Sequence, residues 1–350
     1  MRAVVFHGPG RKGWEEVATP TIQEDSDAII RVDAVTICGT DLHILKGDVP
    51  AVTEGRILGH EAVGTVEQIG ASVTTVAPGD RVLISCITAC GRCRFCREAR
   101  YGLCVGGGGW ILGHRIDGTQ AEYVRVPFAD TSTHVVPDGV SDEAVLMLAD
   151  IGPTGYEVGV LNGRIGPGDT VAVIGTGPIG LASILTAQLF SPSHIVAIDL
   201  ADQRLDAAKQ FGADVQVNPG REDAVERIRE VTGGLGVDTA IEAVGVPESF
   251  ELCAKLVRPG GVVANVGVHG RPATLHLEDL WIKGVTITTG LVDTSSTPTL
   301  LRLIRSGRLD VGRFVTHRYP FDGFLDAYDT FSRAGDTGAL KVVLSRTSGE

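Results

Sequence analysis

Four of the seven cysteines lie close together in the chain and form a candidate metal site. Cys90, Cys93, Cys96 and Cys104 have the spacing C-x2-C-x2-C-x7-C. Four thiolates on one short loop can make a closed tetrahedral cage, as in structural zinc sites that have no open position. An iron–sulfur cluster is the main alternative, although the loop lacks the C-x3-C-P ending of bacterial ferredoxin sequences. We therefore expect a structural zinc site here.

A second set of possible metal ligands precedes this loop. Cys38 and His60 are separated by 22 residues in the chain, and each is next to a glycine. The pair suits a zinc site, but spacing alone is equally compatible with an inert buried cysteine and a hydrogen-bonded core histidine. The same two stretches carry further polar residues that could do chemistry: Thr40, Asp41, His43 and Glu61.

A glycine-rich turn predicts a nucleotide-binding element. The sequence G-x-G-x-x-G follows an apolar run at 171–174 and precedes apolar residues at helical spacing. In such an element the glycines allow a tight turn and a close approach of the backbone to a pyrophosphate, which also meets the N-terminus of the helix. The cofactor contacts predicted in this turn are Gly175, Gly177, Pro178, Ile179 and Gly180.

An acidic residue completes this motif and bears on the choice of cofactor. A second apolar run, 195–198, ends on Asp199, which follows Gly180 by 19 residues. About 20 residues is the expected spacing for a carboxylate that binds the ribose 2′-hydroxyl of NAD. The same carboxylate would repel the 2′-phosphate of NADP, so the sequence predicts NAD. Arg204, five residues further on, is a candidate contact for the adenosine end.

Strands and helices alternate from about Pro153, which predicts a doubly wound parallel sheet and an α/β fold class. The expected strands are 171–174, 195–198, 215–217, 238–243, 262–266 and 285–289, and the helices between them include 223–232 and 247–256. Dinucleotides lie at the carboxyl edge of such a sheet. Four further cofactor contacts are therefore predicted just after strands, at Val244, Val266, Val268 and Leu291.

The first part of the chain lacks this alternation. Short strands expected at 2–6, 28–35 and 120–126 indicate an all-β opening, followed by an amphipathic helix at 142–148. A Gly-Pro break after Asp150 marks the first boundary, and the apolar tail near the C-terminus could return to the first domain. We expect a catalytic domain with both metal sites at 1–152, a Rossmann NAD-binding domain at 153–292, and a return segment at 293–350 that completes the catalytic domain.

Composition and charge limit the classes of protein to which the chain can belong. The 350 residues predict about two domains, and 43% hydrophobic with 21% charged residues is ordinary for a globular enzyme. A net charge of −12 argues against nucleic acid and anionic membranes as partners. No apolar run approaches the ~18–20 residues of a membrane span, and no secretory signal is expected at the N-terminus. Clustered cysteines indicate a reduced, cytoplasmic protein that acts on a small molecule.

Together these features resemble the zinc-containing medium-chain alcohol dehydrogenase family, over essentially the whole chain. The resemblance rests on CGTDLH at 38–43, GHE at 59–61, the four-cysteine loop at 90–104 and GTGPIG at 175–180, in that order. It implies a GroES-like β domain that holds a catalytic and a structural Zn2+ ion, and a Rossmann domain that binds NAD. It also implies a homo-oligomer, with a tetramer favoured over a dimer.

The resemblance assigns roles to individual residues. Cys38 and His60 become ligands of the catalytic zinc, with Asp150, in the matching segment LADIGPTGY, as the third ligand. Thr40 and His43 would relay the proton of the alcohol to solvent by way of the cofactor ribose. Asp41 would orient His60, and Glu61 would be able to approach the metal. Lys341 would contact the pyrophosphate, and Trp110 would line the substrate pocket. Trp110 could equally anchor its glycine-rich loop.

The substrate is less clearly specified. The Cys, His and Asp ligands and Trp110 are similar to those of bacterial secondary-alcohol dehydrogenases, but those enzymes commonly lack the structural-zinc cysteines and often prefer NADP. We expect reversible hydride transfer between NAD and a small secondary alcohol. A polyol or amino-acid-alcohol dehydrogenase is the alternative, in which Glu commonly replaces Asp150, and a non-catalytic NAD-binding redox sensor is the remote one.

Overall fold

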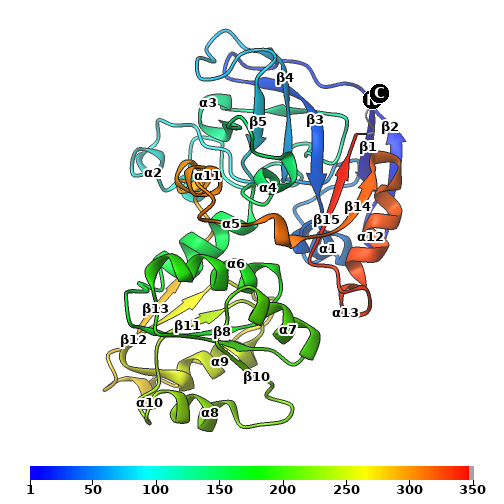
Figure 1. The fold of residues 1–350 in the computed structure, drawn as a ribbon. Helices are drawn as coiled ribbons and strands as arrows, with labels where there is room; N and C mark the ends of the chain where they lie inside the picture. The colour runs from blue at the N-terminus through cyan, green and yellow to red at the C-terminus, as the bar shows by residue number, and fades with distance from the viewer. Residues whose placement is uncertain (347–350) are drawn as a thin grey trace. The chain divides into compact units, whose positions relative to one another are not determined.

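The chain divides into two compact units in the computed structural model, which describes residues 1–346 (Figure 1). The first unit comprises Met1–Asp150 and Asp293–Glu350, and the second comprises Ile151–Val292. The second unit therefore begins two residues before the expected boundary. The last four residues of the expected return segment lie outside the described residues.

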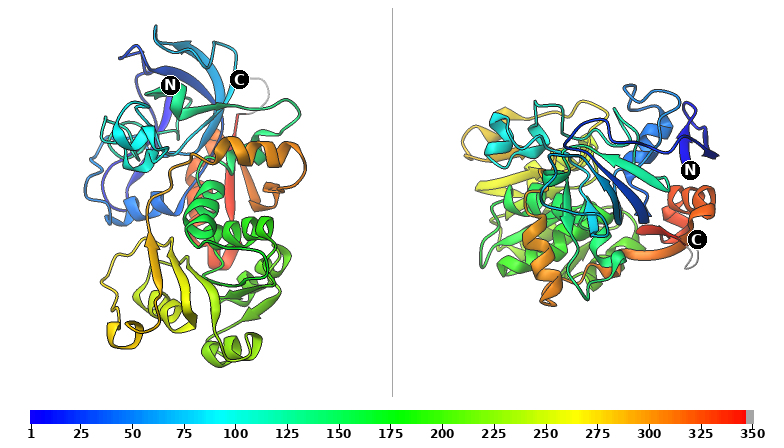
Figure 2. Two further views of the ribbon diagram at one scale, coloured as in Figure 1. Left: turned by 90° about the vertical axis from the view of Figure 1, so that its left-hand side faces the viewer. Right: turned by 90° about the horizontal axis from the view of Figure 1, so that it is seen from above.

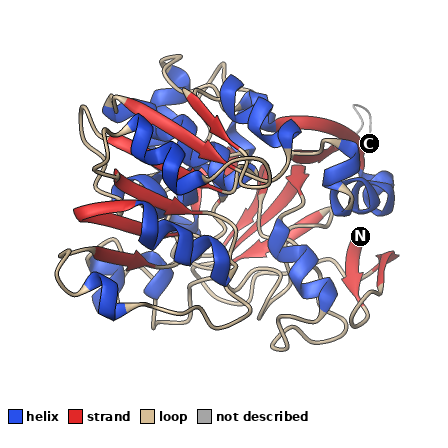
Figure 3. Ribbon diagram, turned by 90° about the horizontal axis from the view of Figure 1, so that it is seen from below, coloured by secondary structure: helices blue, strands red, loops and turns tan. Residues whose placement is uncertain are grey.

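A sheet of seven strands forms the centre of the first unit (Figure 3). The strand order is β14-β15-β3-β4-β5-β7, and β6 also pairs with β3. Only the pair β14–β15 is parallel, and the other pairs of this sheet are antiparallel. The strands are β3 (Ala28–Thr36), β4 (Ala62–Ile69), β5 (Arg81–Ile84), β6 (Tyr123–Val126), β7 (Thr133–Val135), β14 (Val315–Pro320) and β15 (Lys341–Ser345).

The C-terminal segment of the chain belongs to this first sheet, as the sequence indicated. Strand β15 pairs antiparallel with β3, with Val343 opposite Thr36. The helix α12 (Phe324–Ser332) buries Phe324, Tyr328 and Phe331 in the core of the unit. Residues more than 200 positions apart in the sequence therefore lie in one core, and this brings Tyr328 close to the residues around Cys38.

A strand that the sequence analysis did not predict lies near the N-terminus. Strand β1 (Arg2–Phe6) was expected, whereas β2 (Lys12–Glu16) falls in a stretch that looked too rich in glycine, proline and acidic residues. The two strands pair antiparallel as a two-stranded sheet. Trp14 packs on Phe324 with ring centroids 4.7 Å apart, and backbone pairing defines β2 as a strand. Its polar side chains carry no apolar alternation that could have revealed it.

The second unit is a parallel sheet of six strands in the order β10-β9-β8-β11-β12-β13, which confirms the predicted fold class (Figure 2). Successive strands run outward from β8 in one direction and from β11 in the other, so the order reverses between β8 and β11. The strands are β8 (Thr170–Ile174), β9 (His194–Ile198), β10 (Val215–Val217), β11 (Val237–Glu242), β12 (Val257–Asn265) and β13 (Thr286–Thr289).

Helices cover both faces of this parallel sheet. Ala172 and Ile174 point to one face, where the helices α8 (Ala224–Val231) and α9 (Pro247–Leu256) complete an apolar core. Val173 points to the opposite face, beneath α6 (Pro178–Ala187). A strand buried on both faces explains the continuous apolar runs that were visible in the sequence. None of the described helices is long and apolar enough to cross a membrane.

The segment after Asp150 differs from the expected break. The helix α4 (Asp142–Leu146) is shorter than predicted, and beyond Asp150 the chain forms α5 (Ile151–Pro153) and then a π-helix, η2 (Thr154–Leu161). Proline is tolerated in a first helical turn because its missing N–H group would have no partner there. The Gly-Pro pair therefore starts a helical segment rather than interrupting one, and Asp150 stands directly before it.

Candidate metal centres and cofactor-binding residues

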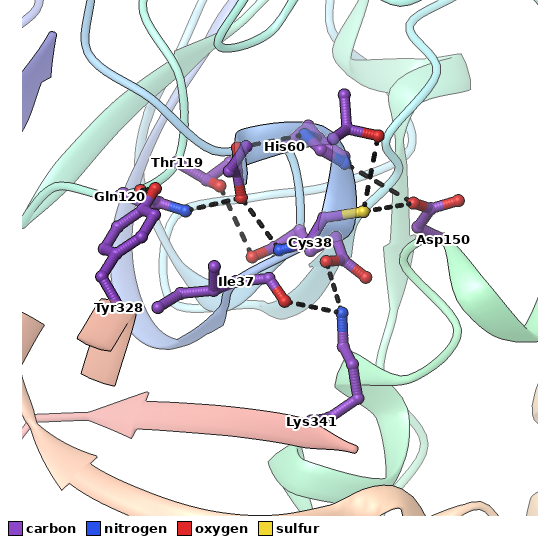
Figure 4. Close-up of polar contacts among 11 residues, drawn as sticks. Ile37, Cys38, His60, Thr119, Gln120, Asp150, Tyr328 and Lys341 are labelled. Carbon is purple, nitrogen blue, oxygen red and sulfur yellow. Dashed lines mark hydrogen bonds and ion pairs between the residues drawn. The ribbon is translucent and has the colours of Figure 1, made fainter. Parts of the chain in front are cut away.

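The four side chains of Cys38, His60, Glu61 and Asp150 converge in the first unit. One ligand atom from each lies within 4.8 Å of the ligand atoms of the others. Asp150 Oδ2 is 3.5 Å from both Cys38 Sγ and His60 Nε2, and these three side chains point toward one another (Figure 4). Thiolate, imidazole and carboxylate donors in such a group fit Zn2+.

Local secondary structure places each of these donors. Cys38 follows β3 and caps the N-terminus of α1 (Gly39–Lys46), and its side chain forms one half of a capping box with Asp41. His60 and Glu61 immediately precede β4, and Asp150 precedes α5. The donors therefore come from the start of α1, the start of β4 and the start of α5. Their side chains can converge because they do not have to alternate between the two faces of a strand.

Without a bound cation, the electrostatics of this centre favour the protonated forms of Cys38 and His60. Burial raises the pKa of the Cys38 thiol, and the charges of Glu61 and Asp150 raise it further. Burial alone would lower the pKa of His60, but hydrogen bonds with Asp150 and Cys38 outweigh it and raise the pKa well above the ordinary value of 6.5. A metal ion that binds here displaces protons from both groups, so its affinity depends on pH.

Lys341 lies beside this centre and contacts Glu61, while its predicted pyrophosphate contact stays a prediction. Its Nζ donates hydrogen bonds to Glu61 Oε2 at 2.7 Å and to the Ile37 carbonyl at 3.2 Å. The side chain is only 1% exposed, because the first position of β15 points into the core. Burial lowers the pKa of Lys341, but the charge of Glu61 outweighs this and raises it, so the ammonium stays charged and enclosed.

Glu61 is held by one oxygen and has the other available. Its Oε2 accepts from Lys341, whereas Oε1 is buried and has no hydrogen-bond partner among the described residues. Burial raises the pKa of this carboxyl, and the Lys341 charge opposes the shift. An unpartnered carboxylate oxygen within a group of metal donors is consistent with the predicted approach of Glu61 to a metal ion.

Asp41 contacts the backbone of one ligand and faces the ring of another. Its Oδ2 accepts a hydrogen bond from the Cys38 backbone N–H at 2.9 Å. Its Oδ1 lies 3.9 Å from His60 Nδ1, which is ion-pair distance but longer than the predicted hydrogen bond. The sequence reasoning missed that Gln120 also donates to Asp41 Oδ2, at 2.9 Å.

The two predicted relay residues lie on α1, three positions apart and therefore on neighbouring parts of one helix face. Thr40 Oγ1 is 3.6 Å from Cys38 Sγ, next to the metal donors. His43 Nδ1 is 2.8 Å from Asp48 Oδ2, and the His43 ring is about half exposed. Thr40 thus stands at the centre and His43 near solvent, which is the order that a proton relay needs.

Trp110 lies next to a metal donor and also anchors its loop. Its ring meets the His60 ring edge-on at 6.3 Å and stacks on His114 with ring centroids 4.3 Å apart. Its Nε1 is buried and has no hydrogen-bond partner among the described residues. Both functions that the sequence left open are compatible with this position.

The four-cysteine loop brings its sulfur atoms together as the spacing predicted. Their Sγ atoms all lie within 4.8 Å of one another, with Cys93 and Cys96 at 3.4 Å, and none of the seven cysteines forms a disulfide. Backbone hydrogen bonds from Cys96 and Val105 lower the pKa of Cys93 to about 6. Burial raises the pKa of Cys96 to about 12. A cation would be needed to hold all four as thiolates.

The glycine turn of the second unit has the geometry of a phosphate-binding turn. Gly175 has φ +88°, a backbone conformation that residues with side chains rarely adopt. A Cβ at Gly180 would overlap the carbonyl oxygen of Gly175. A Cβ at Gly177 would meet nothing within 4 Å, so this N-cap of α6 is open for the approach of a ligand. Pro178 occupies the first helical turn, where its missing N–H group does no harm.

Asp199 stands at the end of β9, as predicted, and its carboxylate is fixed by backbone groups. Oδ2 accepts from the Thr176 N–H at 2.8 Å, and Oδ1 accepts from the Ala201 N–H at 2.9 Å. Arg204 lies 3.9 Å from Asp199 Oδ2. These contacts connect the glycine turn, the acid and Arg204 into one local structure.

The other predicted cofactor contacts are apolar residues that follow the strands β11, β12 and β13. Three of them are largely exposed, with 49% for Val244, 78% for Val268 and 50% for Leu291, and Val266 is partly buried. Large apolar side chains at the carboxyl edge of a parallel sheet are unusual unless a ligand covers them.

Comparison with known proteins places the chain. Residues 24–138 match a family model described as "Alcohol dehydrogenase GroES-like domain", and residues 178–306 match one described as "Zinc-binding dehydrogenase". An alcohol dehydrogenase of Cupriavidus necator is 39% identical over 370 aligned residues, which cover 98% of each chain. The fold and the converging donors thus define a two-domain, zinc-binding dehydrogenase.

Solved structures agree with this assignment. The zinc-dependent alcohol dehydrogenase 2 of Streptococcus pneumonia has a TM-score of 0.95 and 46% identity, over 100% of this chain and 99% of that one. The alcohol dehydrogenase TADH of Thermus sp. ATN1 has a TM-score of 0.93 and 39% identity, over 99% and 100%. The chain belongs to the zinc-containing medium-chain alcohol dehydrogenase family, whose members are NAD(P)-dependent oxidoreductases.

Proposed function

We propose that this chain is an NAD-dependent alcohol dehydrogenase that transfers hydride reversibly between NAD and a small secondary alcohol. The observation that carries the proposal is the convergence of Cys38, His60 and Asp150 beside the Thr40 hydroxyl. Three protein donors suit a catalytic zinc ion, which keeps a position for substrate, and four thiolates suit a structural one. We therefore propose two zinc ions per chain.

The residues of the chain divide the chemistry among them. When bound, zinc would act as a Lewis acid on the substrate oxygen, and NAD would accept the hydride. Cys38, His60 and Asp150 would hold the metal, and burial of His60 keeps bulk water away from it. The Thr40 hydroxyl takes the substrate proton, and the half-exposed His43 returns it to solvent.

The preference for NAD rests on Asp199. Its carboxylate lies where the second strand of the nucleotide-binding unit ends, and two backbone N–H groups hold it in place. A fixed carboxylate accepts hydrogen bonds from a ribose 2′-hydroxyl and repels a 2′-phosphate. Arg204 stands 3.9 Å from Asp199 Oδ2 and balances part of its charge, which opposes the repulsion of a 2′-phosphate, so the preference for NAD rests on Asp199 alone.

The experiment that tests the function is NAD reduction followed at 340 nm with 2-propanol, 2-butanol, ethanol and sorbitol, before and after a strong chelator. We expect activity that is highest with the two secondary alcohols and is abolished by the chelator. Higher activity with sorbitol would replace this proposal with a polyol dehydrogenase. A protein that binds NAD and two zinc ions but oxidises none of these alcohols, nor threonine, would favour a redox sensor instead.

We also propose that the protein is a homo-oligomer of the cytoplasm, with a tetramer favoured over a dimer. Seven unbridged cysteines, four of them on a metal-binding loop, fit a reducing compartment. A row of exposed apolar side chains near the edge strand β13 offers a surface for a second copy. The most exposed of these side chains are Leu277, Trp281 and Ile282.

A further inference from the structure

The Asp41 carboxylate is satisfied on one oxygen and open on the other. Oδ2 accepts two hydrogen bonds of 2.9 Å, from the Cys38 backbone N–H and from Gln120 Nε2. Oδ1 is buried, has no hydrogen-bond partner among the described residues, and lies 3.9 Å from His60 Nδ1. The open oxygen therefore faces the imidazole of a metal donor.

The Gln120 amide has only one orientation that suits this carboxylate. An ionised carboxylate can only accept hydrogen bonds, so Gln120 must turn its NH2 group toward Asp41. The amide oxygen then faces Tyr328, whose hydroxyl donates to it at 2.6 Å. Gln120 and Tyr328 are both fully buried, and Figure 4 shows Tyr328 beside Gln120 on the side away from Cys38. Donation thus runs in one direction, from Tyr328 to Gln120 to Asp41.

We propose that Tyr328 and Gln120 are positioning residues for the metal donor His60. Tyr328 fixes the orientation of the Gln120 amide, the amide fixes Asp41, and Asp41 presents Oδ1 to His60 Nδ1. A carboxylate there favours the imidazole tautomer that carries its proton on Nδ1, and this leaves the Nε2 lone pair for the metal. The inference rests on the proposed function, because it requires a catalytic zinc at Cys38, His60 and Asp150.

The carboxylate of Asp130 differs from that of Asp41. Asp130 accepts hydrogen bonds on both oxygens, from the backbone and the hydroxyl groups of Thr74 and Thr75. Asp41 is more deeply buried than Asp130, so an unsatisfied oxygen costs more there. Asp27 Oδ1 is also buried without a hydrogen-bond partner among the described residues. The feature that distinguishes Asp41 is that its open Oδ1 lies 3.9 Å from the imidazole Nδ1 of His60.

The first test is Tyr328→Phe, which removes one hydroxyl from a buried ring. We measure zinc per chain and the rate at which zinc passes to a chromogenic chelator. Changes to residues that hold metal ligands lower metal affinity by about 10–100-fold. Because Tyr328 is three contacts away from His60, we expect a smaller effect, in which one of the two zinc ions leaves about 3–10 times faster. The zinc of the four-cysteine loop should leave at the wild-type rate, and its retention shows that the variant is folded.

The matched control is Tyr319→Phe. Tyr328 belongs to α12, and the Tyr319 hydroxyl hydrogen-bonds another residue of that helix, Thr330, at 2.7 Å. This hydrogen bond has no connection to Asp41. We expect both zinc ions to leave this variant at the wild-type rates. A faster loss of zinc in Tyr319→Phe equal to that in Tyr328→Phe would assign the effect to the helix rather than to the hydrogen-bonded chain.

The second test separates hydrogen bonding from packing at Gln120. In its ionised form Gln120→Glu keeps the acceptor for Tyr328 but cannot donate to Asp41 and adds a like charge, so zinc loss is measured at pH 8 to 9. Gln120→Met keeps only the volume. We expect zinc loss to be fastest in Gln120→Glu, intermediate in Gln120→Met and slowest in wild type. After replacement of the catalytic zinc by Co2+, the visible absorption bands should shift in both variants, because the ligand field reports the His60 ring.

Two results would overturn the inference, and they are distinguishable. If wild type binds two zinc ions but Tyr328→Phe and Gln120→Glu keep wild-type zinc-loss rates and cobalt spectra, the inference fails and the proposed function stands. If wild type binds zinc only at the four-cysteine loop, the proposed function fails and the inference fails with it.

Discussion

At the scale of single residues, the chemistry depends on a few polar groups whose surroundings differ sharply. Thr40 is next to Cys38 Sγ, whereas His43 on the same helix is half exposed. One turn of α1 therefore spans the distance from a buried centre to solvent. In the proposed relay, the first proton transfer belongs to a hydroxyl and the last to an imidazole, a type of side chain suited to proton exchange near neutral pH.

Replacement of Thr40 by alanine tests this arrangement. We expect Thr40→Ala to lower kcat by about 10²–10⁴-fold, which is the usual contribution of a positioned proton-transfer group. NAD affinity and zinc content should not change, because Thr40 is not among the proposed ligands. Thr40→Ser keeps a hydroxyl and should retain most of the activity. Equal activity of the alanine and serine variants would remove Thr40 from the relay.

Asp150 belongs to the same scale. We expect Asp150→Asn to lose one of two zinc ions, because a neutral amide is a weaker zinc ligand than a carboxylate. Metal analysis after dialysis against a mild chelator gives the count per chain. The four-cysteine zinc serves as the internal control and should remain. Two tightly held zinc ions in the variant would exclude Asp150 as a ligand.

The protonation of the same centre predicts how zinc retention depends on pH. The pKa values of Cys38 and His60 are both raised, so both groups hold protons that zinc must displace. The apparent zinc Kd should therefore rise as pH falls from 9 to 6, by more than about tenfold per pH unit when two protons are exchanged. Chelator competition at several pH values measures this, with Thr40→Ala as a control that keeps the ligands. A Kd that is independent of pH would contradict these shifts.

At the scale of elements, the glycine turn and the start of α6 form one local unit with the end of β9. Asp199 accepts a hydrogen bond from the Thr176 N–H within the turn, so the acid that we propose to select the cofactor also stabilises the turn itself. A change at Asp199 therefore affects both binding and stability, and the two effects have to be measured separately.

Asp199→Asn separates them, because asparagine keeps an acceptor for the backbone but loses the charge. We expect kcat/KM with NAD to fall about tenfold, which corresponds to the loss of one hydrogen bond to a charged group. The value with NADP should rise, because the repulsion of the 2′-phosphate is removed. An unchanged Tm would show that the turn is intact. The proposal fails if the ratio of the two values stays as in wild type.

At the scale of the whole molecule, the candidate metal donors and the glycine turn lie on different units. The metal donors all belong to the first unit, and the glycine turn belongs to the second. The return segment is part of the first unit, because β15 pairs with β3. Removal of that segment would therefore delete outer strands of the sheet. It would also remove Lys341 and Tyr328 from the surroundings of the candidate metal centre.

The surface of the second unit makes a prediction about assembly. Trp281 is 76% exposed and Ile282 75%, and they precede the edge strand β13, whose outer backbone groups have no partner strand in this sheet. Exposed apolar patches beside an open strand edge are typical of contacts between chains. We expect Trp281→Glu to shift the protein toward monomers in light scattering after gel filtration. Leu235→Glu, at another exposed leucine, should leave the assembly unchanged, and the same oligomer in both variants would exclude this surface.

Periodicity and spacing in the sequence determined much of the local structure. The parallel strands, the glycine turn with Asp199 and the four-cysteine loop could all be read from short segments, because each depends on residues that are neighbours in the chain. Strand β2 was missed because its polar side chains show no alternation. The helical start after Asp150 was missed because a Gly-Pro pair usually ends an element rather than begins one.

The contacts around the metal centre were decided by tertiary structure. The family resemblance implied a pyrophosphate contact for Lys341 and gave no sign of its contact with Glu61, which depends on the pairing of β15 with β3. Gln120 and Tyr328 gave no signal, because they are separated by more than 200 residues and neither belongs to a motif. A buried charge requires a partner wherever the fold can supply one, and only the packed chain determines which residue is near enough.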